Sequence, residues 1–137
     1  MLKKFIMENY IPIATPTSHG EHLFKEDREW KVQNKEYRSI VGRIMFLIKT
    51  KPYFEFSVSL VARYMSNPSI IHIKVAKRIL RYVKGIINFG IHYACNYKLK
   101  LIGFSDSNWG SDLDDRKRTS ANCFSLWLGM VSWCSRK

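Results

Sequence analysis

Hydrophobic residues recur every three or four positions through the middle of the chain and at alternate positions near its C-terminal end. The first spacing is typical of amphipathic helices and the second of half-buried strands. Three helices are predicted: over residues 36–49, from Pro52 to about Met65, and from Ser69 to Lys84. Pro52 suits a first helical turn, where a missing N–H costs no hydrogen bond. Gly85 is a common residue directly after a helix.

The part of the chain before these helices is less regular. Residues 2–8 are predicted to form a short amphipathic helix that ends ahead of Pro12. Residues 13–20 are rich in turn-forming residues and are predicted to be extended. Residues 20–36 are charged and lack a clear period, so they are interpreted as a linker.

The predicted helix over residues 69–84 has two chemically distinct faces. Its apolar stripe consists of Ile73, Ala76, Leu80 and Val83. Its basic stripe consists of Lys74, Lys77, Arg78, Arg81 and Lys84. At about 100° per residue, Leu80 is expected to pack into a core while Arg78 and Arg81 face solvent.

From Lys98 onwards the hydrophobic period is two. Strands are predicted over residues 99–106, 121–128 and 131–135, with a tight turn at Gly129 and Met130 between the last two. The predicted fold class is therefore α+β, a helical region followed by a three-stranded antiparallel sheet. Three segments are expected: 1–36, 37–97 and 98–137.

The charge of the chain is concentrated in the middle segment. The 137 residues carry 23 Lys plus Arg and 11 Asp plus Glu, a formal net charge of +12. Residues 37–97 contain ten basic residues and one acid, Glu55, so their net charge is +9. This imbalance favours a polyanionic partner, with nucleic acid ahead of an acidic membrane surface. The alternative is a solvated helix face without a partner.

Several other classes of protein are disfavoured by composition. No apolar run approaches the length of a membrane span. Glu8 and Asn9 interrupt the hydrophobic start, so no signal peptide is evident. Cys95, Cys123 and Cys134 provide neither a disulfide framework nor a paired zinc motif, so no metal and no cofactor are predicted.

A series of short blocks resembles the copia-type retrotransposon Pol polyprotein just after its polymerase palm. The blocks are LKKFIMEN at 2–9, Thr15-Pro16, YRSIVG at 37–42, AKRILRYVKG at 76–85, FSDSNWG at 104–110, DLDDRK at 112–117 and VSW at 131–133. The resemblance covers nearly the whole chain. It implies a thumb-like helix and linker over 1–36, a basic helical connection region over 37–97, and a truncated ribonuclease H-like sheet over 98–137.

The same resemblance argues against catalysis by this chain. No paired-aspartate turn of a polymerase palm precedes residue 106, and only Asp106 matches the ribonuclease H carboxylates, where it would be vestigial. Ribonuclease H chemistry needs two metal ions held by several carboxylates. His72 and His92 lack a suitably spaced nucleophile or carboxylate and are interpreted as structural or exposed. The expectation is a non-catalytic Pol fragment without a small-molecule substrate, which could bind nucleic acid through the basic stripe.

A second resemblance leads to an alternative function. Arg78, Ile79, Leu80 and Arg81 form an Arg-x-Leu-Arg tetrapeptide. It resembles the translocation motif of RxLR effectors, which oomycetes secrete into plant cells to suppress defence-related cell death. This alternative implies a secreted virulence protein with a host plant protein as partner, whereas a transposon fragment would be intracellular.

Overall fold

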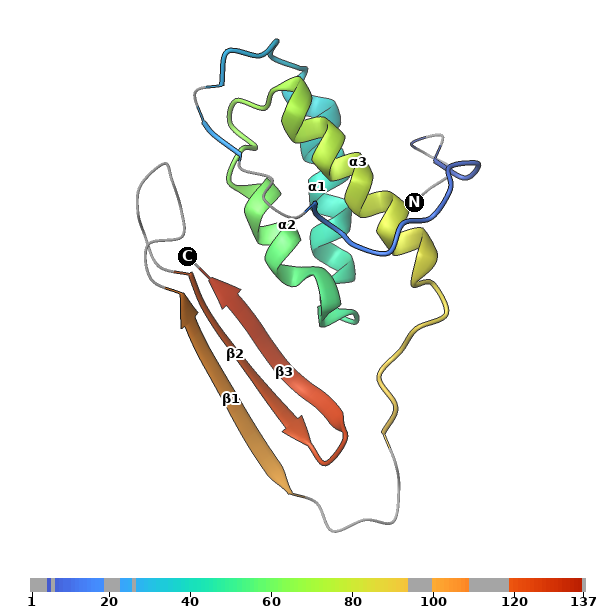
Figure 1. Cartoon of the computed structure of the whole chain (residues 1–137), viewed down its shortest axis with the longest axis vertical. Helices are drawn as coiled ribbons and strands as arrows, with labels where there is room; N and C mark the ends of the chain where they lie inside the picture. The colour runs from blue at the N-terminus through green and yellow to red at the C-terminus, as the bar shows by residue number, and fades with distance from the viewer. Residues whose placement is uncertain are drawn as a thin grey trace. The chain divides into compact units, whose positions relative to one another are not determined.

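The computed structural model describes residues 5, 7–18, 23–25, 27–93, 100–108 and 119–136. The chain divides into two compact units, Met1–Phe89 and Gly90–Lys137 (Figure 1). Helices make up the first unit and strands the second. This α+β content agrees with the prediction from hydrophobic spacing.

The helical unit contains α1 (Asn34–Leu47), α2 (Glu55–Ala62) and α3 (Ile70–Gly85), with a 3-10 turn over Pro52–Phe54 leading into α2. Each helix packs against the other two. The residues that are fully buried at their centre come from all three helices and are mostly aromatic or branched. They include Tyr37, Ile40, Val41, Ile44, Phe54, Val58, Val61, Ile79 and Leu80. The three predicted helices are confirmed, and all three contribute to one core.

Helix α3 is buried over a wider arc than its predicted apolar stripe. Ile73, Ala76, Leu80 and Val83 are buried, as the spacing predicts. The buried arc also includes His72, Val75 and Ile79. At about 100° per residue, these buried positions span a little less than half of the helix circumference.

The segment interpreted as a linker is in fact part of the helical unit. The Val32 N–H donates to the carbonyl of Pro68 at 3.0 Å, and the Ile70 N–H donates to the carbonyl of Trp30 at 2.9 Å. The Tyr64 hydroxyl donates to the carbonyl of Leu23 at 2.7 Å. The linker prediction was therefore wrong for this stretch, because its backbone is hydrogen-bonded to Pro68 and to Ile70 at the start of α3.

Most of the helix predicted over residues 2–8 lies outside the described residues. Of its described members, Phe5 packs against the core and Met7 is buried. The following residues, 11–13, have no regular secondary structure, and Pro12 lies against Gly85 at the end of α3.

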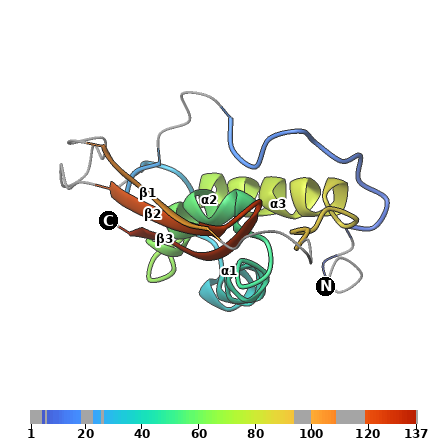
Figure 2. The same cartoon turned by 90° about the horizontal axis from the view of Figure 1, so that it is seen from below.

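In the second unit, β1 (Leu101–Asn108), β2 (Thr119–Leu126) and β3 (Gly129–Arg136) form one antiparallel layer in the order β1-β2-β3 (Figure 2). Phe104 pairs with Cys123, and Cys123 pairs with Trp133. The sheet is therefore a simple meander with consecutive strands as neighbours. The polar loop predicted between the first two strands lies mostly outside the described residues.

The turn between β2 and β3 is two residues earlier than predicted. Leu126 pairs with Gly129, so Trp127 and Leu128 form the loop, and Trp127 adopts the left-handed conformation with φ 57°. Gly129 is required for space and not for a positive φ, since a Cβ there would lie 2.4 Å from the Tyr93 ring. The Tyr93 hydroxyl donates to the carbonyl of Met130 at 2.6 Å and fixes the ring over the strand. The glycine accommodates an aromatic ring, and the positive φ falls on the tryptophan.

Candidate nucleic-acid interface

The five basic residues predicted as one stripe do lie along α3, but their surroundings differ. Lys74 is exposed. The Lys77 Nζ lies 3.7 Å from a carboxylate oxygen of Glu36 on α1. The remaining three, Arg78, Arg81 and Lys84, are half-buried.

A stretch of the N-terminal segment, residues 8–15, covers this half-buried end of the helix and is called the strap below. Arg81 donates from Nε to the carbonyl of Ile11 at 2.9 Å. Lys84 donates from Nζ to the carbonyl of Tyr10 at 2.9 Å and also to the carbonyl of Glu8. Nearer the middle of α3, the side chain of Arg78 donates from Nη2 to the hydroxyl of Thr15 at 3.0 Å.

The strap runs antiparallel to α3, because its residue numbers fall as those of the bonded helix residues rise. The N-terminal segment can be followed across the yellow end of α3 (Figure 1). The Cβ of Pro12 lies 3.4 Å from the position of a Cβ built on Gly85, so the strap passes at van der Waals distance from the last residue of α3. Arg78 and Arg81 therefore lie outside the apolar core, as expected, but the strap leaves them half-buried.

The strap binds three cations without neutralising them. All of its acceptors are backbone carbonyls or a hydroxyl. Within the described parts of the chain, the one carboxylate at ion-pair distance from any of the five basic residues is Glu36. The positive charge of this end of α3 thus persists beneath the strap.

The Arg-x-Leu-Arg tetrapeptide is part of this arrangement. Ile79 and Leu80 are fully buried in the core, and both arginines are bonded to the strap. In the folded chain these four residues do not form an exposed linear tag.

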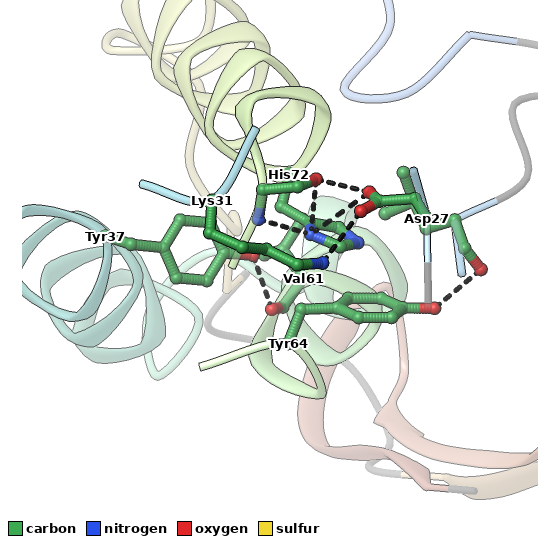
Figure 3. Close-up of polar contacts among 8 residues, drawn as sticks. Asp27, Lys31, Tyr37, Val61, Tyr64 and His72 are labelled. Atoms are coloured by element: carbon green, nitrogen blue, oxygen red, sulfur yellow. Dashed lines mark hydrogen bonds and ion pairs between the residues drawn. The ribbon is translucent and has the colours of Figure 1, made fainter. Parts of the chain in front are cut away.

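A second polar cluster lies at the start of α3, where Asp27, Lys31, Tyr64 and His72 come together (Figure 3). The Ser69 N–H donates to His72 Nδ1 at 2.9 Å, as in a capping box. The Ser69 hydroxyl donates to the Asp27 carboxylate, and Lys31 Nζ donates to the same carboxylate at 2.9 Å. The His72 ring stacks on Tyr64 with 4.0 Å between ring centroids.

Although it contains Ser, His and Asp, this cluster does not have the geometry of a catalytic triad. In a triad the serine and the carboxylate bind opposite nitrogens of the imidazole ring, whereas here the Ser69 hydroxyl, at 3.0 Å, and the Asp27 carboxylate, at 4.0 Å, both lie at His72 Nδ1. Ser69 and His72 are both fully buried, so no substrate reaches them. The cluster instead caps the start of α3 through hydrogen bonds, and the Asp27 carboxylate interacts favourably with the positive end of the helix dipole. The Asn67-Pro68-Ser69 helix start was visible in the sequence, but Asp27 was missed because it falls in the supposed linker.

Comparison with known proteins places this chain among transposon-derived sequences. It is 34% identical over 128 residues to the Pol polyprotein of transposon RE1 from Arabidopsis thaliana, across 92% of this chain and 9% of that protein. It is 34% identical over 102 residues to an uncharacterized mitochondrial protein of the same plant, of which it covers 42%. The chain belongs to the copia-type retrotransposon Pol family.

Secreted RxLR effector protein 161 of Plasmopara viticola is also similar, with 36% identity over 107 residues, which covers 75% of that protein. No family model matches the chain, and no solved structure matches it. This copia-type chain therefore spans most of the effector's length but only about a tenth of the Pol polyproteins it resembles.

The one ribonuclease H-type carboxylate predicted in this copia-type chain lies on the sheet. Asp106 is an exposed residue of β1 and pairs with Ala121. Across the described ranges, no group of three His, Cys, Asp or Glu residues is placed to hold a metal ion. Asp112, Asp114 and Asp115 lie outside those ranges. No helix in the described part of the chain is long and apolar enough to cross a membrane.

The cap at the start of α3 predicts a loss of stability in acid. Burial raises the pKa of Asp27, but hydrogen bonds from Ser69 and Lys31, with the nearby positive charge, outweigh it and lower that pKa below 3.8. A depressed carboxylate pKa stabilises the fold fully above the unfolded-state value, and this contribution disappears as pH falls through the folded-state pKa.

We expect the free energy of unfolding to fall as the pH is lowered below about 4, in part through Asp27. Urea titrations from pH 6 to pH 2.5 measure this. Asp27→Asn should be less stable at pH 6 by about 1–3 kcal/mol, because a charged acceptor is lost. The free energy of unfolding of this variant should also fall less steeply as the pH is lowered from 6 to 2.5. Parallel pH profiles for the two proteins would contradict the assignment.

Proposed function

We propose that this copia-derived chain is a non-catalytic protein that binds nucleic acid through the basic face of α3. The observation that supports this proposal is a row of five cations on one helix, of which a single member pairs with a carboxylate among the described residues. A row of like charges creates a positive potential that attracts polyanions. Phosphate oxygens are the anions that Lys and Arg bind most readily in a row.

The spacing of the cations suits a nucleic-acid backbone. Lys74 and Lys84 are ten residues apart, about 15 Å along a helix axis. Double-stranded DNA presents one negative charge per roughly 1.7 Å of its axis, so several phosphates fall within that length. The contacts would be made to phosphates and not to base edges, so binding should be indifferent to sequence.

In this proposal the sheet corresponds to part of a ribonuclease H-like fold, and Asp106 is its one matching carboxylate in this sequence. Asp106 alone supplies too few oxygen ligands for two divalent cations. The protein would therefore bind duplex or hybrid without cleaving it. Its positive residues would supply affinity, and its sheet would supply no chemistry.

The salt dependence of binding tests this function. Each phosphate neutralised by a cation contributes about −0.9 to the slope of log affinity against log salt concentration. Replacing Lys74 and Lys77 with Gln should flatten that slope by about 1.8, since both lysines lie outside the strap. Fluorescence anisotropy with two DNA duplexes of unrelated sequence and one RNA–DNA hybrid provides the measurement.

A matched control separates a specific surface from net charge. Lys49→Gln with Lys100→Gln removes the same charge from exposed positions outside α3. This pair should leave the slope nearly unchanged. Equal flattening by both pairs, or no binding at 50 mM salt, would refute the proposed surface.

A second candidate function is that of an effector that suppresses defence-related cell death in plants. It is favoured by the 36% identity to a secreted RxLR effector over three quarters of that protein's length. In this candidate the whole folded surface would act on a host protein, because the tetrapeptide is built into α3.

Expression inside plant cells together with a cell-death inducer tests the effector candidate. The candidate predicts that the wild-type chain reduces cell death. An Arg78→Ala, Arg81→Ala variant addresses the tetrapeptide, and Lys74→Ala, Lys77→Ala is its matched control on the same helix. If the wild type leaves cell death unchanged, the effector candidate is wrong.

A further inference from the structure

We infer that the strap is a built-in competitor for the phosphate-binding face of α3, so that nucleic acid must displace it to reach Arg78, Arg81 and Lys84. This inference rests on the proposed function and adds its regulation. Two states follow. With the strap in place, only Lys74 and Lys77 of the five cations can bind nucleic-acid phosphates. With the strap released, all five can.

The strap occupies the donors that a phosphate would need. Arg81 Nε and Arg78 Nη2 each donate to a strap oxygen, and Lys84 Nζ donates to two. These acceptors are neutral. The bonds to the strap are charge-assisted only through their cationic donors, whereas a phosphate adds an opposite charge of its own and can bind Arg in a bidentate way, so phosphates would gain more from the same donors. The exchange therefore favours the polyanion at low salt.

The strap itself buries little that would resist release. The side chains of Tyr10 and Ile11 are 52% and 77% exposed, although both residues offer carbonyls to the helix cations. Its main apolar anchor is the preceding residue Met7, which is 2% exposed. Thus residues 8–15 can leave α3 while Met7 stays in the core. Arg78, Arg81 and Lys84, which nucleic acid would bind, are therefore also the residues whose hydrogen bonds keep the strap on α3.

A disulfide can lock the strap beside Gly85, the last residue of α3. The Cβ of Pro12 lies 3.4 Å from a Cβ built on Gly85. This is close to the 3.5–4.5 Å usual between the Cβ atoms of a disulfide. The test protein is the full chain with Pro12→Cys and Gly85→Cys, in a background with Cys95, Cys123 and Cys134 replaced by Ser. Mass spectrometry after alkylation reports the fraction that is cross-linked.

The probe is a 20-base-pair DNA duplex at salt concentrations from 50 to 300 mM. The reduced protein should show a slope steeper by up to about 2.7 than the oxidised protein, because three further cations become available. Its affinity at 50 mM salt should be at least about tenfold higher. Each single-cysteine variant should behave like the reduced protein whether or not reductant is present.

The outcomes distinguish the two proposals. Equal slopes for the oxidised and reduced protein, with binding retained, would overturn the competing strap and leave nucleic-acid binding intact. Tighter binding by the oxidised protein would overturn it too, since the strap would then be part of the site. Absence of binding in every form would refute the proposed function itself.

If the cross-link fails to form, a substitution in the strap decides the question. Thr15→Ala removes the acceptor for Arg78 without touching the helix. It should steepen the salt slope by up to about 0.9. Thr50→Ala is the matched control, since that hydroxyl donates to the Leu47 carbonyl at the end of α1. An unchanged slope for Thr15→Ala would overturn the inference.

Discussion

The central interaction of the helical unit is the contact between three cations of α3 and the neutral oxygens of the N-terminal strap. The opposite side of α3 is buried against α1 and α2, and the cations lie on the side that the strap covers. Carbonyl oxygens satisfy their hydrogen bonds but leave their charge in place. The strap therefore stabilises the folded chain and preserves a strong positive field at one surface.

The two ends of α3 are secured in different ways. At its start, Ser69, His72 and Asp27 form a buried cap, with Lys31 as the counter-charge of the carboxylate. Beyond its last residue, Lys51 donates to the carbonyls of Ile86 and Ile87 at 3.0 and 3.2 Å. Both devices satisfy backbone groups that a helix end leaves without intrahelical partners. They make α3 a rigid support for the basic face.

Part of this structure followed from the sequence because side-chain spacing records it. The burial of Ile73, Ala76, Leu80 and Val83 is a direct consequence of their helical period. The strap could not be found in this way, because its acceptors are mainly backbone carbonyls, which every residue type offers. Asp27 was missed for a related reason: its partners Ser69 and His72 are more than forty residues away. The turn at Trp127 was misplaced because a positive φ is expected at glycine.

The most direct test of the strap is the side-chain Nε–Hε signal of Arg81 in a ¹H–¹⁵N NMR spectrum of the full chain, assigned with an Arg81→Lys variant. A hydrogen bond from this group to the Ile11 carbonyl should slow its exchange with water at least about tenfold relative to the exposed Arg43. When the DNA duplex is added to the reduced double-cysteine protein at low salt, the Arg81 signal should shift, because its hydrogen-bond acceptor changes from the Ile11 carbonyl to a phosphate. Exchange of Arg81 as fast as that of Arg43 in the free chain would contradict the structure on which the account depends.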